Sequence, residues 1–230
     1  MKTTAAATAA AFVWEPLISI GGTATISKSK LRRLKLNGDW QVSQAGKNDW
    51  ILATVPGCVH TDLLASKKIP DPFYRDNEKA VQWVGQSDWI YQRTFDVPKE
   101  VLQNDKILLR CEGLDTLATI KINGAEIGRA ENMFRLWEFD AKPFLRAGEN
   151  KIEITFESPL TYIKAQEQRS DDAPWKFVKG PAWVRKEPCS FGWDWGPDLP
   201  SCGIWKNISL ETFNQGRIAD VLILQNHSGK

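Results

Sequence analysis

A series of short, closely spaced apolar segments constrains the fold of this 230-residue chain more than any other feature. Residues 89–95 alternate between two faces, residues 106–111 form a compact apolar run, and residues 151–156 form another. Asn123-Gly124 separates two further alternating segments and is the strongest short hairpin signal that a sequence offers. Because no regular alternation of strands with helices is present, the pattern predicts an all-β sandwich with short helices.

The other predicted elements are shorter or less regular. They are a strand over 34–42 with a turn or bulge at Gly38, strands over 134–139 and 204–213, and helices over 58–68 and 161–169. Residues 31–214 are therefore predicted to form the β domain. Residues 1–30 are predicted to be a leader or a disordered segment, and 215–230 a linker with one more apolar strand over 218–224.

Composition and charge exclude several classes of function. The net charge is only +2, from 30 basic and 28 acidic residues, which leaves no electrostatic footprint for nucleic acid or an anionic membrane. No apolar run is long enough to span a bilayer. Gly-rich phosphate loops are absent from the sequence, and the four cysteines match no zinc spacing, so we expect no cofactor and no metal.

Two of the cysteines, Cys189 and Cys202, bracket an aromatic loop and could approach each other across it. Free thiols are the favoured alternative, because a domain of this size does not depend on disulfides.

The first 29 residues do not decide between a cytoplasmic and a secretory compartment. Lys2 and an Ala-rich stretch resemble a signal peptide that Glu15 and Pro16 interrupt, so we lean towards a cytoplasmic protein, or a secreted or lysosomal one if the segment is a signal.

The longest irregular segment, residues 170–203, carries the candidate site. Loops of this length are uncommon unless they are functional. Near its end Trp193, Asp194 and Trp195 place one carboxylate between two indoles, in a chain that has eleven tryptophans. Rings of this kind cover the apolar faces of a sugar, and a carboxylate accepts hydrogen bonds from its hydroxyls. The structural alternative is a buried tryptophan cluster around a capped aspartate.

His60 invites a second hypothesis, because it lies beside Cys58 and Asp62 in the sequence. A nucleophilic triad is nevertheless not expected. Residues adjacent in a helix do not face each other, and the chain has no Gly-x-Ser-x-Gly elbow. We therefore interpret His60 as a structural histidine near the start of a helix.

Several motifs resemble the N-terminal domain of the β-mannosidases, in the glycoside hydrolase family that also includes β-galactosidase and β-glucuronidase. They are Leu36-Asn37-Gly38-Asp39-Trp40, Val55-Pro56-Gly57-Cys58-Val59-His60-Thr61-Asp62-Leu63, Asp71-Pro72-Phe73-Tyr74-Arg75-Asp76-Asn77-Glu78, Trp89-Ile90-Tyr91, Lys121-Ile122-Asn123-Gly124 and the loop Phe191 to Pro197. The resemblance runs from about Leu34 to the end of the chain. It implies a galactose-binding-domain-like jelly roll followed by an immunoglobulin-like domain, whose first strand would be 218–224.

The resemblance also implies a function. A downstream (β/α)₈ barrel of the same polypeptide would carry the two glutamates of a retaining mechanism, so no catalytic residue is expected in this chain. Asp194 would bind hydroxyls of the terminal mannose of a mannoside or manno-oligosaccharide, with Trp193 and Trp195 shaping the pocket wall. The loop over residues 69–78 would flank the same entrance. The alternatives are an autonomous carbohydrate-binding module and a scaffold domain whose aromatic side chains are only core.

Overall fold

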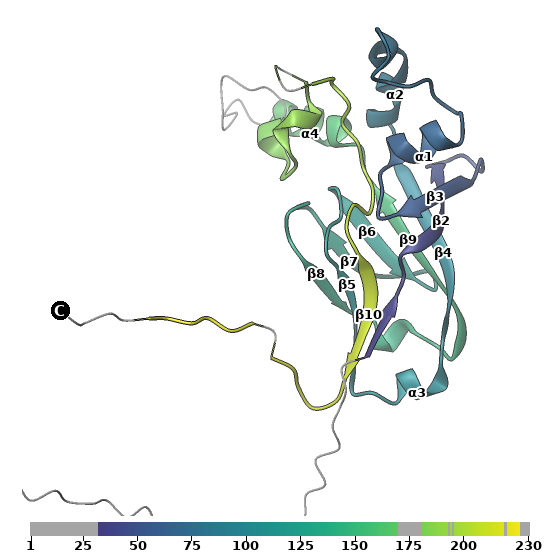
Figure 1. Cartoon of the computed structure of the whole chain (residues 1–230), viewed down its shortest axis with the longest axis vertical. Helices are drawn as coiled ribbons and strands as arrows, with labels where there is room; N and C mark the ends of the chain where they lie inside the picture. Colours follow the sequence, from purple (N-terminus) through teal and green to yellow (C-terminus); the bar gives the residue numbers. More distant parts are fainter. Residues whose placement is uncertain (1–31, 170–180, 193, 195, 219, 226–230) are drawn as a thin grey trace, which may run out of the picture.

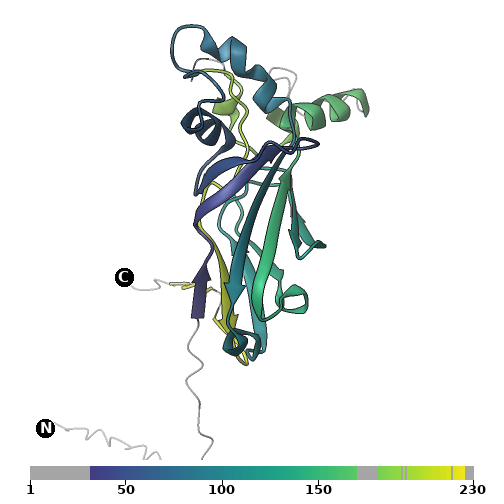
Figure 2. The ribbon, with the colours of Figure 1, turned by 90° about the vertical axis from the view of Figure 1, so that its right-hand side faces the viewer.

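Two antiparallel sheets packed face to face form the body of the molecule, as the ribbon views show (Figures 1 and 2). The computed structural model describes residues 32–169, 181–192, 194, 196–218 and 220–225. The four-stranded sheet has the order β1-β10-β5-β8, and the six-stranded sheet has the order β3-β2-β4-β9-β6-β7. The predicted all-β jelly-roll sandwich with short helices is confirmed. The leader predicted over 1–30 lies outside the described residues.

The strands are short and bury alternate residues between the sheets. Each large apolar side chain buried in this way contributes about 1.5–3 kcal/mol of burial free energy. Their bounds are β1 Arg32–Lys35, β2 Gly38–Gln44, β3 Ile51–Val55, β4 Trp89–Val97, β5 Lys106–Cys111, β6 Ala118–Ile122, β7 Ala125–Ala130, β8 Trp137–Asp140, β9 Gly148–Phe156 and β10 Ile208–Phe213. The nine paired positions of β4 and β9 form the centre of the larger sheet.

The N-terminal strand differs from the prediction in an informative way. Residues 34–42 do not form one strand with a bulge, because β1 pairs with β10 in one sheet and β2 pairs with β3 and β4 in the other. Gly38 has a φ of +103°, a conformation that glycine adopts without strain, and the chain changes sheet there. The Arg93 guanidinium donates to the carbonyl oxygens of Leu36 and Asn37 and holds this crossing in place.

The Asn123-Gly124 hairpin is confirmed. Both residues have positive φ values, 51° and 84°, as the tight turn between β6 and β7 requires. The Asn123 amide also donates to the Asn150 side chain at 2.8 Å and accepts from the Lys151 backbone at 3.0 Å. The turn residue therefore also ties the hairpin to β9.

Two predicted strands begin later than expected. β8 starts at Trp137 because the Phe134 backbone N–H bonds to the Asn132 side chain at 2.9 Å, which bends the chain into a turn. β10 starts at Ile208 because the Ile204 carbonyl accepts from the Gly57 N–H at 2.9 Å instead of joining the sheet. The strand β3 was not predicted.

The helices α1, α2 and α4 gather at one end of the sandwich, above the strand ends in Figure 1, whereas α3 lies at the opposite end. The predicted helix over 58–68 is the shorter α1, and the one over 161–169 is confirmed as α4. The sequence pattern predicted neither the short helices α2 and α3 nor the 3₁₀ helices η1 to η4. The bounds are α1 Val59–Ala65, η1 Asn77–Val81, α2 Gln82–Gly85, α3 Lys99–Leu102, η2 Lys142–Phe144, α4 Pro159–Arg169, η3 Pro181–Trp183 and η4 Pro188–Ser190. No helix in the described ranges is long and apolar enough to cross a membrane.

The C-terminal segment contacts the sandwich near its start, where Arg217 pairs with Glu211 at 2.7 Å and with Glu138. Ile218 and residues 221–224 are highly exposed, and the described part of 215–225 contains no strand. The division of the chain at 30 and 214, and the assignment of 215–230 to a following immunoglobulin-like domain, stay predictions. All four cysteines are free, with Cys189 exposed and Cys202 buried.

Candidate functional site

The aromatic loop is a narrow hairpin at the helical end of the sandwich. After η4, Phe191 and Asp198 form an antiparallel bridge, and the Leu199 N–H bonds to the Ser190 carbonyl at 2.9 Å. Gly192 lies against Asp198 and has a φ of +78°, a backbone conformation that glycine adopts without strain and that turns the chain at this point. Among the described residues, Asp194, Gly196 and Pro197 lie beyond this bridge, at the tip.

Asp194 lies in a turn at this tip and is exposed. Within the described residues its carboxylate has no hydrogen-bond or ion-pair partner that would compete with a ligand. This exposure differs from the structural alternative, which was a buried aspartate. Trp193 and Trp195, the other two predicted site residues, lie outside the described residues.

The segment around α2 supports one side of the loop. The Asp198 N–H bonds to Glu78 Oε1 at 3.0 Å, and the Gln82 amide donates to the Asp198 carbonyl at 2.7 Å. A side chain at Gly85 would come within 2.8 Å of the Pro200 carbonyl, so only glycine allows this close packing. Partial burial, together with the neighbouring Glu78 carboxylate, raises the pKa of Asp198. Glu78 is the last residue of the loop over 69–78, which the resemblance places beside the entrance of the sugar site. It contacts the base of the aromatic loop.

A buried ion pair supports the loop from below. The Lys186 ammonium group is fully buried and pairs with Asp115, at the connection between β5 and β6, and with Glu187 at 3.2 Å. Glu187 in turn accepts from the Ser190 hydroxyl at 2.5 Å, and Asp115 pairs through its backbone with Gly203. Burial raises the pKa of Asp115, an effect that the Lys186 charge opposes.

Sequence reasoning missed this pair. Asp115 and Lys186 are 71 residues apart, and Arg185-Lys186-Glu187 reads as a solvated charge run. No local signal marks the lysine as buried. The cluster is structural: it clamps both arms of the loop to the sandwich, so that the tip is presented from a rigid base.

His60 is confirmed as structural. Its Nδ1 shares a hydrogen bond of 3.0 Å with the Ser201 hydroxyl, which links α1 to the loop. Asp62 does not face His60, because its two oxygens accept from the Thr54 N–H at 3.0 Å and the Tyr91 hydroxyl at 2.7 Å. Burial, with a smaller contribution from the Lys186 charge, lowers the pKa of His60 from 6.5 to about 4.

The lowered pKa of His60 predicts a loss of stability in mild acid. The folded chain holds the ring neutral, so the stabilisation is complete above pH 6.5 and is lost as the pH falls towards 4. The full effect is up to about 3 kcal/mol. Urea unfolding of the wild type and of His60→Gln between these pH values checks this. The wild type should lose more free energy of unfolding than the variant. Equal losses in the two proteins would contradict a lowered pKa for His60.

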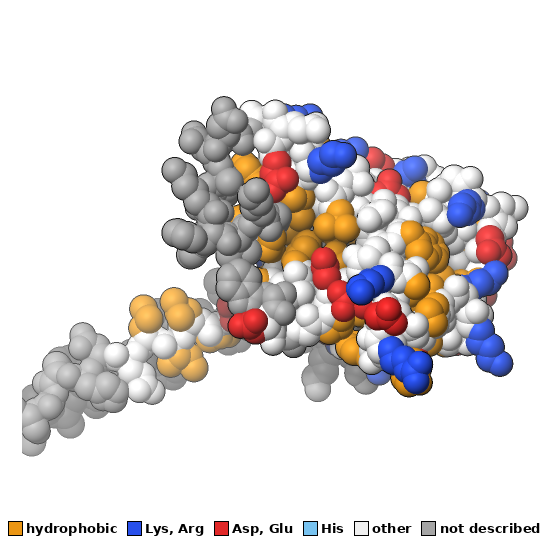
Figure 3. Space-filling model, turned by 90° about the horizontal axis from the view of Figure 1, so that it is seen from above, with side chains coloured by type: hydrophobic (Ala, Val, Ile, Leu, Met, Phe, Trp, Pro, Cys, Tyr) orange, Lys and Arg blue, Asp and Glu red, His pale blue; other side chains and the backbone are white. Residues whose placement is uncertain are grey.

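Seen from above, this end of the molecule shows hydrophobic patches with acidic side chains between them (Figure 3). Among the described residues no group of three or more His, Cys, Asp or Glu side chains is placed to hold a metal ion. What the site offers is a projecting carboxylate on a rigid support, which suits the recognition of hydroxyl groups.

An antiparallel two-sheet sandwich with such a loop at one end defines a galactose-binding-like domain. Residues 40–206 match the family described as glycosyl hydrolase 2 galactose-binding domain-like, and the chain belongs to that family.

Several β-mannosidases are similar to this chain. The chain is similar to the β-mannosidase of Bos taurus (35% identity over 81% of this chain and 22% of that protein) and to β-mannosidase B of Thermothelomyces thermophilus (36%, over 82% and 22%). Among solved structures it resembles β-D-mannosidase from Dictyoglomus thermophilum, with a TM-score of 0.76 and 43% identity over 82% of this chain and 23% of that one. The chain therefore spans about a fifth of the length of these relatives.

Proposed function

We propose that this chain is the N-terminal domain of a β-mannosidase and helps to shape the subsite for the terminal β-mannose. The similarity to β-mannosidases across four fifths of the chain supports the choice of enzyme. The observation that supports the role of the loop is the exposed carboxylate of Asp194 on a clamped hairpin, where it has no partner among the described residues. A charged acceptor of this kind contributes about 1.5–3 kcal/mol for each hydroxyl bond. Trp193 and Trp195 are proposed as the pocket wall.

The chemistry itself is proposed to belong to a downstream barrel of the same polypeptide. Its two glutamates would release non-reducing-end β-D-mannosyl residues by a retaining mechanism, one as acid/base and one as nucleophile. In this division of labour the present domain binds and orients the sugar, and the barrel breaks the bond. The proposed partners are accordingly mannosides or manno-oligosaccharides and the barrel.

The 230-residue chain made alone is expected to show no hydrolysis of an aryl β-mannoside above background, because the proposed acid and nucleophile are outside it. The control uses Glu78 and Asp198, neighbouring carboxylates of which Asp198 has a raised pKa. Turnover by the wild-type chain that Asp198→Asn or Glu78→Gln abolishes would overturn the proposal, since the chemistry would then reside in this domain.

The alternative is an autonomous carbohydrate-binding module, which the exposed position of Asp194 also permits. Titrating mannose and manno-oligosaccharides against the tryptophan fluorescence of the chain separates the two. A module would bind with Asp194-dependent affinity without any other domain. A subsite completed by a barrel would bind measurably only in the longer protein.

A further inference from the structure

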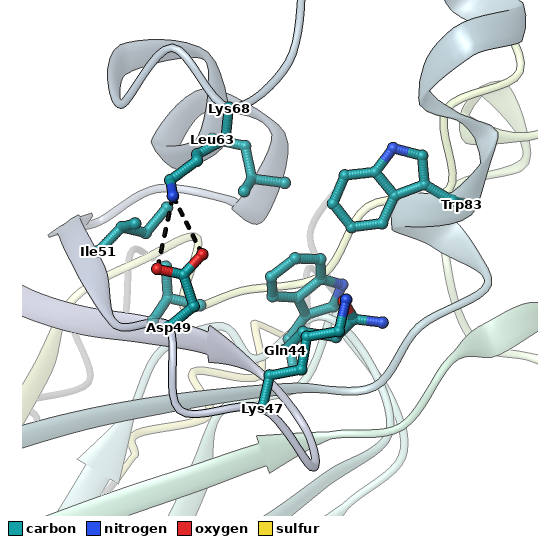
Figure 4. A pocket seen from close by; sticks show the side chains of 9 residues that line it. Gln44, Lys47, Asp49, Ile51, Leu63, Lys68 and Trp83 are labelled. Carbon is teal, nitrogen blue, oxygen red and sulfur yellow. Dashed lines mark hydrogen bonds and ion pairs between the residues drawn. The ribbon is translucent and has the colours of Figure 1, made fainter.

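A pocket separate from the aromatic loop, lined by residues of β2, β3, α1 and α2, has the composition of a sugar-binding site (Figure 4). Its volume is about 130 Å³. On this measure a cavity holds one water molecule from about 10–15 Å³ upwards, so the pocket has room for a ligand much larger than a water molecule. Buried Val42, Leu63 and Trp89 contribute apolar lining, while polar side chains form part of its wall.

Trp83 is the aromatic wall of this pocket. It is 38% exposed, whereas Trp89, whose ring centroid lies 5.8 Å away, is 3% exposed. The Trp89 N–H donates to the Val84 carbonyl at 2.9 Å, but the Trp83 N–H has no partner among the described residues. An indole left open beside its buried neighbour offers a ligand both a stacking surface and a donor.

The polar groups of the pocket are held in place and retain bonding capacity. Asp49, which is 69% exposed, pairs with Lys68 at 3.0 Å. The Gln44 amide nitrogen is fixed on the Ser87 hydroxyl at 2.9 Å, and its carbonyl oxygen has no partner among the described residues. The Lys47 ammonium group also has none there. Exposed ion pairs contribute only about 0–1 kcal/mol to stability, so the fold does not require this arrangement.

A second aromatic pocket, near α4, is less suited to a sugar. Its volume is about 190 Å³, and Trp137 forms part of its wall. The Trp137 ring is already engaged, with the Arg135 guanidinium 4.8 Å above it and Phe139 stacked at 6.4 Å. Trp83, by contrast, has only the tilted contact with Trp89 as a ring contact among the described residues, and it keeps an exposed surface.

We propose that the pocket beside Trp83 binds one pyranose ring of a neutral saccharide, separately from the aromatic loop. The ring would stack on Trp83, with its hydroxyls bonded to Asp49, Lys47 and Gln44. Asp49 is neutralised by Lys68, and the hydroxyls of a neutral ring can both donate to its carboxylate and accept from Lys47. The site rests on the proposed function only in the choice of a mannose-containing probe. Gln82, the neighbour of Trp83 on α2, contacts the base of the aromatic loop, which places the pocket on the flank of that loop.

Heteronuclear NMR of the isotope-labelled chain tests this with methyl β-mannoside and mannobiose as probes. Trp83→Phe identifies the indole N–H resonance of Trp83, which should shift saturably in the wild type. Trp83→Ala should weaken binding, followed on backbone resonances of the pocket, by about tenfold or more. Asp49→Asn should weaken it by about tenfold as well. Asp49 is exposed, so this variant keeps the test decisive if Trp83→Ala fails to fold.

Glu126→Gln is the matched control, because Glu126 is a half-exposed carboxylate in an ion pair with Arg129 outside the pocket. It should leave binding unchanged. Asp194→Asn should leave the Trp83 shift in place even if it inactivates the full-length enzyme, which separates this proposal from the proposed function. The proposal is overturned if no saturable shift appears at tens of millimolar sugar, if Asp49→Asn binds normally, or if glucuronate alone shifts the resonance.

Discussion

Asp194→Asn in the full-length enzyme should lower kcat/KM for a β-mannoside by roughly ten- to several-thousand-fold. The substitution keeps the shape of the side chain but removes the charge that strengthens its bonds to sugar hydroxyls. If those bonds tighten in the transition state, kcat falls together with affinity. The melting temperature should change little, because Asp194 is exposed and has no partner among the described residues.

Asp96→Asn is the control for this measurement. Asp96 is an exposed carboxylate on β4, and the variant should leave both kcat/KM and the melting temperature unchanged. The binding role of Asp194 fails if its variant melts early while the folded fraction keeps normal kinetics. That result would assign the residue to the structure of the loop.

Lys186→Met should lower the free energy of unfolding of the chain by about 3–5 kcal/mol, because it leaves the buried Asp115 carboxylate without its counter-charge. Urea unfolding measures the loss. Lys164→Met, at an exposed position on α4, is the matched control and should fall within about 0.5 kcal/mol of the wild type. A loss below about 1 kcal/mol for Lys186→Met would show that the pair does not clamp the loop.

The same variant should become relatively more stable in acid. Burial already raises the pKa of Asp115, and without Lys186 nothing of comparable charge opposes the rise. A carboxyl group whose pKa is higher in the folded than in the unfolded chain stabilises the fold fully at a pH below its unfolded pKa, near 3.8. That stabilisation is lost as the pH rises through the pKa of the folded chain. The deficit of Lys186→Met against the wild type should therefore shrink as the pH is lowered from neutrality.

The sequence predicted those parts of the fold that depend on local pattern. The alternation predicted over 89–95 lies within β4, which continues to Val97, and the apolar run of β5 was predicted with the bounds that the structure has. Asn123-Gly124 marked its hairpin. Asp194 was selected as a candidate from its two indole neighbours, and its exposure now agrees with a binding role that stays a proposal.

Tertiary structure alone decided which segments meet. The assignment of β1 and β2 to different sheets depends on pairing with β10 and β4, far away in the sequence. The Lys186–Asp115 pair spans 71 residues, and the bond from Asp198 to Glu78 spans 120. Alternation and turn residues act over a few positions, so they specify strands and hairpins. Burial of a charge depends on groups brought together by the whole fold, which is why the support of the loop became visible only in three dimensions.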